Sequence, residues 1–211
     1  MSNKNLHRIY EQGSLSIDDV AADPMAQFSA WYREAEVIYE KETCIMSLST
    51  VSADNRPHSR IVLLKDFNEN GLVFFTNYDS HKGKEIAGNP FGALLFFWPS
   101  MGRQVRIEGR IEKASRDVSA AYFNSRPRAS QIGATVSPQS KLVTDRAALD
   151  KAFDDMLTHA GDTPLPCPEN WGGYVLAPDR MEFWQGRDSR FHDRLLYTQN
   201  DAQWQCQRLA P

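Results

Sequence analysis

A row of basic side chains near the end of the sequence is the first candidate for chemistry. Arg190, His192 and Arg194 stand two residues apart within the segment EFWQGRDSRFHDRLLY. Successive side chains of a β-strand point to opposite faces, so a strand here would present all three on one face. Two guanidinium groups beside an imidazole suit a bound anion or a developing negative charge. The alternative is a solvated strand face whose arginines pair with Asp188 and Asp193.

The segment RIVLLK, residues 60–65, places a cation at each end of an apolar run that is typical of a strand. Five strand residues span about 16 Å, roughly the length of a flavin mononucleotide (FMN) from phosphate to ring. Alternation puts Arg60 and Lys65 on opposite faces unless a bulge intervenes. The segment therefore reaches both ends of such a ligand only if the strand is irregular, and charged residues are in any case common at strand ends.

A predicted helix start in SHKGKE also suits an anion. Ser80 can cap the helix, and Lys82 and Lys84 would then oppose the helix dipole. That arrangement makes sense if an anion sits at the free N–H groups. Otherwise the two lysines point to solvent.

The segment YFNSRPRAS repeats polar side chains at four-residue intervals, at Tyr122, Arg126 and Ser130. A continuous helix would align them on one side, but Pro127 disfavours helical geometry at Arg126. A turn between two helices would still gather two hydroxyls and a guanidinium around one phosphate.

The composition excludes several classes of protein. The chain has 211 residues, 41% of them apolar and 24% charged, and a net charge of -3, so nothing drives it as a whole toward nucleic acid or an anionic membrane. Its strongest apolar run, residues 93–98, is too short to span a bilayer, and no apolar segment stands at the N-terminus. We therefore expect a soluble, cytoplasmic protein.

Sequence motifs for metals, disulfides and phosphate-binding loops are absent. The 3 cysteines lack a CxxC spacing and the 5 histidines lack HxH or HxxxH pairs, which predicts neither a disulfide framework nor a metal site. Neither GxGxxG nor GxxxxGK[ST] occurs, so any phosphate must be bound by side chains.

The order of predicted elements indicates a mainly β fold. We expect a mobile arm at residues 1–22 and one domain at 23–211, which opens with a helix from Asp23 and Pro24 to about residue 42. Strands are expected at 44–51, 58–66, 72–76, 91–98, 103–113, 171–177, 180–185, 190–198 and 203–207. Helices are expected at 80–88, 115–125 and 145–159, with a short turn from Pro127. Short connections between strands predict antiparallel pairing.

Taken together, these segments resemble the pyridoxine/pyridoxamine 5'-phosphate oxidase family. The resemblance runs from about residue 23 to 211 and rests on RIVLLK, FFTN, RQVRIEG, YFNSRPRASQIGA, VSPQS, NWGGY, EFWQG, RFHDRLLY and RLAP in matching order. It implies an antiparallel FMN-binding split β-barrel flanked by helices, which forms a homodimer with flavin at the subunit interface. It also implies oxidation of pyridoxine 5'-phosphate or pyridoxamine 5'-phosphate to pyridoxal 5'-phosphate by dioxygen, with hydrogen peroxide as a product.

The resemblance also carries site residues onto this sequence. The implied FMN contacts are Arg60, Ile61, Val62, Leu63, Leu64, Lys65, Phe75, Thr76, His81, Lys82, Gln104, Gln139, Ser140, Trp184 and Arg194. The implied substrate contacts are Lys65, Tyr122, Arg126, Ser130, Arg190, His192 and, from the arm, Tyr10. Arg190 and His192 are the implied catalytic residues.

The sequence departs from the family pattern at two places. His81 stands where the family usually has an arginine, which predicts a weaker or pH-dependent contact with the cofactor phosphate, and His7 stands at an arginine position of the substrate lid. Three alternative functions remain open: a related flavin oxidase of the phenazine-pathway type, a flavin carrier without turnover, and a β-barrel that binds RNA. The acidic balance argues against the last.

Overall fold

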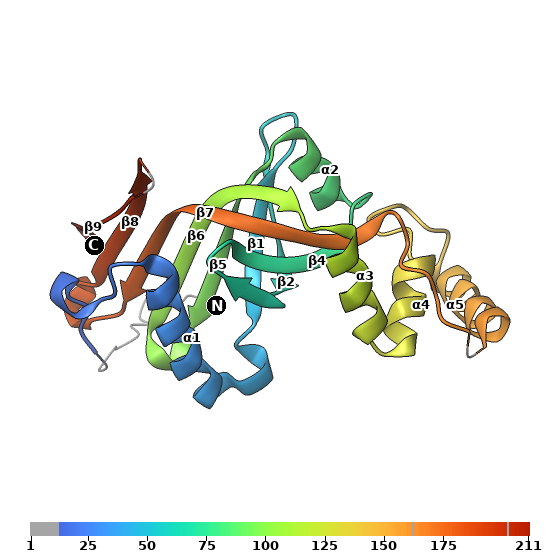
Figure 1. Cartoon of the computed structure of the whole chain (residues 1–211), viewed down its shortest axis with the longest axis horizontal. Coiled ribbons are helices and arrows are strands. Elements are labelled where there is room, and N and C mark those ends of the chain that lie inside the picture. Colours follow the sequence, from blue (N-terminus) through green and yellow to red (C-terminus); the bar gives the residue numbers. More distant parts are fainter. Residues whose placement is uncertain (1–12, 162, 202) are drawn as a thin grey trace, which may run out of the picture.

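The structure, a computed structural model, describes residues 13–161, 163–201 and 203–211. In this part of the chain one antiparallel sheet forms the centre and the helices pack at its sides (Figure 1). The strands are β1 (Ile45–Val51), β2 (Pro57–Leu63), β3 (Asp66–Asn68), β4 (Gly71–Asn77), β5 (Phe91–Trp98), β6 (Arg103–Lys113), β7 (Trp171–Gln185), β8 (Asp193–Asn200) and β9 (Gln203–Leu209). The α-helices are α1 (Pro24–Tyr39), α2 (His81–Gly88), α3 (Arg116–Ser125), α4 (Arg128–Val136) and α5 (Arg146–Ala160).

The order of the strands makes the sheet curl. It runs β2-β1-β5-β6-β7-β4-β3, with β8 and β9 added beside β7. β2 and β3 lie at opposite ends of that order, yet only Leu64 and Lys65 separate them in sequence. The amide of Leu64 donates to Cys44 O and that of Lys65 to Val73 O, so this connection joins both edges. A sheet whose two edges meet at one connection has to close on itself as a barrel.

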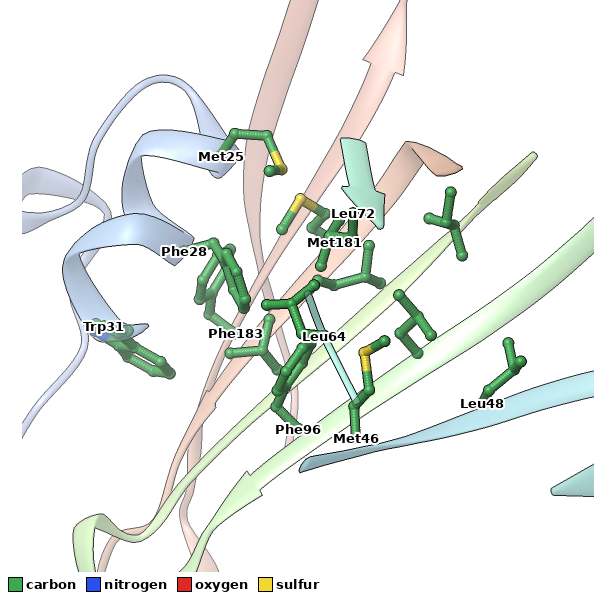
Figure 2. Close-up of a cluster of buried hydrophobic side chains, with 14 of the residues drawn as sticks. Met25, Phe28, Trp31, Met46, Leu48, Leu64, Leu72, Phe96, Met181 and Phe183 are labelled. Carbon is green, nitrogen blue, oxygen red and sulfur yellow. The ribbon is translucent and has the colours of Figure 1, made fainter. Parts of the chain in front are cut away.

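The core lies between the inner face of the sheet and helix α1 (Figure 2). Phe28 of α1 is fully buried, with its ring 5.1 Å from that of Phe96 on β5. Trp31, one turn further along, meets Phe183 of β7 edge-on at 5.3 Å. Full burial of such a side chain stabilises the fold by about 1.5–3 kcal/mol, so α1 is held by its apolar face.

Capping residues begin α1, α2, α3 and α5, and the sequence predicted the caps of α1 and α2, Asp23 and Ser80. Asp23 accepts hydrogen bonds from the amides of Met25 and Ala26, and Pro24 occupies the first turn of α1. Ser80, Ser115 and Asp145 cap α2, α3 and α5 in the same way. Each cap satisfies N–H groups that a helix start leaves without a partner.

Four sequence predictions about element boundaries are wrong. The strands expected at 171–177 and 180–185 form the single strand β7, because a bulge leaves Asp179 unpaired between Pro178, opposite Gly109, and Arg180, opposite Glu108, without ending the pairing with β6. The strand expected at 58–66 stops at Leu63. The expected turn after Pro127 is the nine-residue helix α4.

The fourth error concerns residues 190–198, which were expected to form one strand. β8 begins only at Asp193, because Ser189 and Arg190 adopt positive φ angles of 59° and 62° in a short 3-10 turn, residues 188–190. Arg190, His192 and Arg194 therefore do not form a row on one strand face. The alternative pairing is also wrong, since Asp193 pairs with Arg187 and Arg208, and Arg194 pairs with Glu182.

The segment before α1 is attached to the last strands. Leu15 is 5% exposed, its amide donates to Asp193 Oδ2 at 3.1 Å, and its carbonyl accepts from Arg208 at 2.8 Å. The rest of the expected arm, residues 1–12 with His7 and Tyr10, lies outside the described residues, and the division at residue 22 stays a prediction. No helix in the described residues is long and apolar enough to cross a membrane.

Candidate functional site

A cavity of about 540 Å³ opens between β2, β4 and the corner that joins α3 to α4. It is lined by Ile61, Val62, Leu63, Lys65, Phe75, Thr76, Lys82, Tyr122, Arg126, Pro127, Ser130, Gln139 and Trp171. Apart from Pro127 and Trp171, all of these were named from the sequence. The structure thus brings residues from four distant segments, each implied to bind a phosphate or a flavin, to one hollow.

The corner between α3 and α4 explains how three polar side chains reach the cavity without a continuous helix. α3 ends at Ser125, and Arg126 has an extended backbone (φ −76°, ψ 150°) because Pro127 follows it. Gln131 Nε2 donates to Arg126 O at 2.9 Å and holds the corner in place. Tyr122, Arg126 and Ser130 therefore line one cavity from both sides of a turn.

Arg126 is a cation with no anion to bind in the described part of the chain. Its Nη1 is buried without a hydrogen-bond partner, and its guanidinium lies 4.8 Å from the ring centre of Trp171. Burial lowers the pKa of Arg126, against a smaller opposing effect from Tyr122. A buried cationic N–H group without a partner costs free energy, so the position favours a bound anion.

Trp171 is a cavity residue that the sequence did not predict as part of the site. Its ring is nearly parallel to that of Phe75, at 5.6 Å and 17°, and to that of Tyr122, at 6.2 Å and 12°. The motif NWGGY contains it and could have pointed to it. The stack gives one wall of the cavity a flat aromatic surface.

Another part of the cavity lining consists of Lys82 and its hydrogen-bond partners. Its ammonium donates to Thr76 Oγ1 and to Gln139 Oε1, both at 3.1 Å. Burial lowers the pKa of Lys82, and the nearby charge of Arg60 lowers it further, against an opposing effect of Glu85. An anion bound near Lys82 would offset the repulsion that Arg60 exerts on its ammonium group.

Arg60 itself lies outside the cavity lining, in a network behind Lys82. Its Nη2 donates to Glu85 Oε2 at 3.1 Å and its Nη1 to Leu48 O at 3.3 Å. Burial alone would raise the pKa of Glu85, but hydrogen bonds from Thr50, His58 and Arg60 hold it below its usual range.

Three other predicted cofactor contacts also lie outside the lining. Leu64 is 4% exposed and packs in the core, whereas His81 and Ser140 are exposed next to Lys82 and Gln139 in the sequence. Lys65 reaches the cavity because it follows the end of β2, so the strand alternation that separated it from Arg60 does not apply.

A second group of predicted residues gathers elsewhere. Gln104, Trp184 and Arg194 are neighbours across β6, β7 and β8 in the strand register. Their side chains point away from the core, because the alternating Val105, Phe183 and Leu195 are fully buried.

The predicted catalytic residues belong to this second group. The ring of His192 lies 4.7 Å from that of Trp184, and His192 Nδ1 accepts a hydrogen bond from the Arg187 amide at 3.1 Å. Arg190 is exposed, two residues before His192, and forms no ion pair with any described residue.

The two groups cannot meet within one chain. Trp171 in the cavity and Trp184 in the second group stand near opposite ends of the 15-residue strand β7, so roughly 40 Å of extended chain separates them at about 3.3 Å per residue. Figure 1 shows β7 crossing the molecule from β8 to α3. A ligand about 16 Å long cannot bridge that distance.

Two family models match the chain. One, described as pyridoxamine 5'-phosphate oxidase, covers residues 19–160. The other, described as the pyridoxine 5'-phosphate oxidase C-terminal dimerisation region, covers residues 171–211 and so includes the whole second group except Gln104.

Similar proteins align with this chain over nearly its full length. The pyridoxine/pyridoxamine 5'-phosphate oxidase of Burkholderia vietnamiensis is 51% identical over 205 residues, which cover 96% of this chain and 95% of the relative. That of Herminiimonas arsenicoxydans is 49% identical over 212 residues, with 100% of both chains covered.

Solved structures confirm the fold. PhzG from Burkholderia lata, in complex with tetrahydrophenazine-1-carboxylic acid, matches with a TM-score of 0.89 at 27% identity over 96% of this chain and 99% of that one. An FMN-binding protein related to pyridoxamine 5'-phosphate oxidase, from Nostoc punctiforme, matches in fold with a TM-score of 0.71 at 19% identity, over 91% and 100%. The antiparallel split barrel expected from the sequence is confirmed.

Proposed function

The chain belongs to the pyridoxamine 5'-phosphate oxidase family, and on that premise we propose that it oxidises pyridoxine 5'-phosphate and pyridoxamine 5'-phosphate to pyridoxal 5'-phosphate. The cofactor is FMN and the electron acceptor is dioxygen. Hydrogen peroxide is formed, together with ammonia when the substrate is the amine. This reaction serves the biosynthesis and salvage of vitamin B6.

The Nη1 atom of Arg126, buried without a hydrogen-bond partner, is the observation that carries the proposal. Lys65, Tyr122 and Ser130 line the same cavity and add a second cation and two hydroxyls. Such a set suits a phosphate ester, since charge-assisted hydrogen bonds to phosphate are worth about 1.5–3 kcal/mol each. We assign these residues to the phosphate of the substrate.

The remaining cavity residues fit FMN. Lys82, with Arg60 behind it, supplies cations for the cofactor phosphate, and Thr76 and Gln139 already hold the lysine in place. Ile61, Leu63 and Phe75 offer apolar surface for a flavin ring. When bound there, FMN would supply the hydride-accepting chemistry for the C4' carbon of the substrate and the reactivity with dioxygen. The protein binds and orients both molecules.

We place the rest of the site on a second copy of the chain. The sheet face that carries Gln104 and Trp184 also exposes large apolar side chains: Ile45 is 41% exposed, Ile61 65% and Phe97 47%. An apolar exposed face of this kind is typical of a protein interface. In a homodimer formed through it, the second group of one copy would complete the cavity of the other, which also agrees with the dimerisation model at residues 171–211.

Arg190 and His192 of that second copy would then reach the substrate ring. We propose that they pack against it and orient the C4' carbon and the alcohol or amine group that loses its proton. Because His192 Nδ1 accepts a backbone N–H, a neutral His192 carries its hydrogen on Nε2. The imidazole therefore offers a donor to the substrate oxygen or nitrogen.

The principal test measures flavin and turnover together. The purified protein should show an oxidised flavin spectrum that bleaches when pyridoxine 5'-phosphate is added without oxygen, and should consume oxygen in air. A spectrum without bleaching would indicate a flavin carrier. Bleaching by a reduced phenazine precursor, but not by pyridoxine 5'-phosphate, would favour the function of PhzG.

A mixing experiment tests whether two copies share each site. Arg126→Met damages only the cavity and Arg190→Ala only the second group, so a heterodimer of the two variants contains one intact site. Random reassociation of the unfolded variants should restore about a quarter of the wild-type sites, since half of the dimers are mixed. No recovery above the sum of the separate variants would refute a shared site.

A further inference from the structure

The carboxylate of Asp193 accepts hydrogen bonds from three separate segments of the chain. Its Oδ2 accepts from the Leu15 amide and from Arg187 Nη1, both at 3.1 Å, and its Oδ1 accepts from Arg208 Nη1 at 2.6 Å. Burial alone would raise the pKa of Asp193, but these hydrogen bonds outweigh it and lower the pKa below its usual range. The group is thus a fixed anion at the start of β8.

The loop that Asp193 closes is strained. Ser189 and Arg190 both have positive φ angles, 59° and 62°, which cost free energy for residues other than glycine. Two contacts fasten the ends of the loop, namely the Arg187 amide to His192 Nδ1 and the Arg187 side chain to Asp193. Backbone strain of this kind persists only where the surrounding contacts fix it.

We propose that Asp193 is a positioning residue for catalysis, which acts through Arg187 to hold the loop at residues 187–192 in its strained shape. The inference rests on the proposed function, since that loop carries Arg190 and His192. The Arg187–Asp193 ion pair fixes where Arg187 sits, and the Arg187 amide then fixes the ring of His192.

The two arginines that bind Asp193 separate this role from simple stabilisation. Their side chains are equally exposed, at 45% each. Arg208 makes the shorter contact with Asp193 and a second one with Leu15 O, whereas only Arg187 belongs to the loop. If Asp193 merely stabilised the fold, loss of Arg208 would be at least as harmful as loss of Arg187.

The experiment compares Arg187→Met, Arg208→Met, Asp193→Asn and the conservative Arg187→Lys in the FMN-loaded protein. The readouts are kcat with pyridoxine 5'-phosphate, the Kd of pyridoxal 5'-phosphate, and the melting temperature. We expect Arg187→Met and Asp193→Asn to lower kcat by about 10- to 100-fold, the range expected when reacting groups are misplaced by up to ~1 Å. Arg208→Met should lower the melting temperature but keep kcat, and Arg187→Lys should recover most of kcat.

The outcomes separate this inference from the proposed function. A wild-type protein without turnover would refute the proposed function. An active wild type with an unaffected Arg187→Met variant, or with equal kcat losses in Arg187→Met and Arg208→Met, would overturn the role of Asp193. If Asp193→Asn fails to fold, the three arginine variants alone still test whether Asp193 positions the loop.

Discussion

Replacement of Arg126 by methionine tests the substrate-phosphate site directly. Methionine keeps an unbranched, flexible side chain in the corner but removes the charge. One charge-assisted hydrogen bond is worth about 1.5–3 kcal/mol, and each ~1.4 kcal/mol is a factor of ten. The KM for pyridoxine 5'-phosphate should therefore rise by about 10- to 150-fold. The phosphate is remote from the reacting C4' carbon, so kcat should change little.

The assay compares pyridoxine 5'-phosphate with unphosphorylated pyridoxine. Wild type should prefer the phosphorylated compound, and Arg126→Met should lose most of that preference because only the phosphate contact is removed. Arg126→Lys, which keeps the charge but not the planar fork, should give an intermediate KM. Arg128→Met is the matched control, since Arg128 lies in the same corner, donates to Gly161 O and does not line the cavity.

Two results would refute this reasoning. An unchanged preference for the phosphorylated substrate in Arg126→Met would mean that Arg126 binds something else. Equal effects of Arg126→Met and Arg128→Met would mean that the corner between α3 and α4 had merely been disrupted.

Other predictions concern the cofactor and acid stability. Arg60→Ala should lose FMN on dialysis because the cofactor phosphate loses a cation, while His81→Arg should retain FMN more tightly; a full flavin spectrum at wild-type affinity in Arg60→Ala would contradict the assignment. The pKa values of Glu85 and Asp193 are both lowered by folding, so the stability they contribute is present above the ordinary carboxyl pKa of about 4 and is lost as the pH falls through the lowered values. Urea unfolding measured from pH 7 to pH 3 should show this loss in the free energy of unfolding. Glu85→Gln should make that free energy depend less steeply on pH, and an equally steep dependence in the variant would exclude a contribution from Glu85.

Local signals in the sequence predicted most of the elements, because each depends on neighbours in the chain. Asp23 and Ser80 marked two helix starts as caps, and the helices expected from residues 115 and 145 do begin next to the caps Ser115 and Asp145, since a cap needs only its own first turn. The errors arose where distant contacts decide the outcome. Pairing with β6 carries β7 through Pro178, which a local reading takes as a break.

The sequence alone also predicted which side chains take part in the site, through motifs whose order resembles one family. It could not determine that these side chains form two groups at opposite ends of β7, or that Arg190 stands in a strained turn outside β8. Those facts depend on the curl of the sheet and on contacts such as that between Arg187 and Asp193. The type of each residue determines which chemistry its side chain can perform. The distance between two such side chains depends on every element that lies between them, so only the tertiary structure decided which of them share a site.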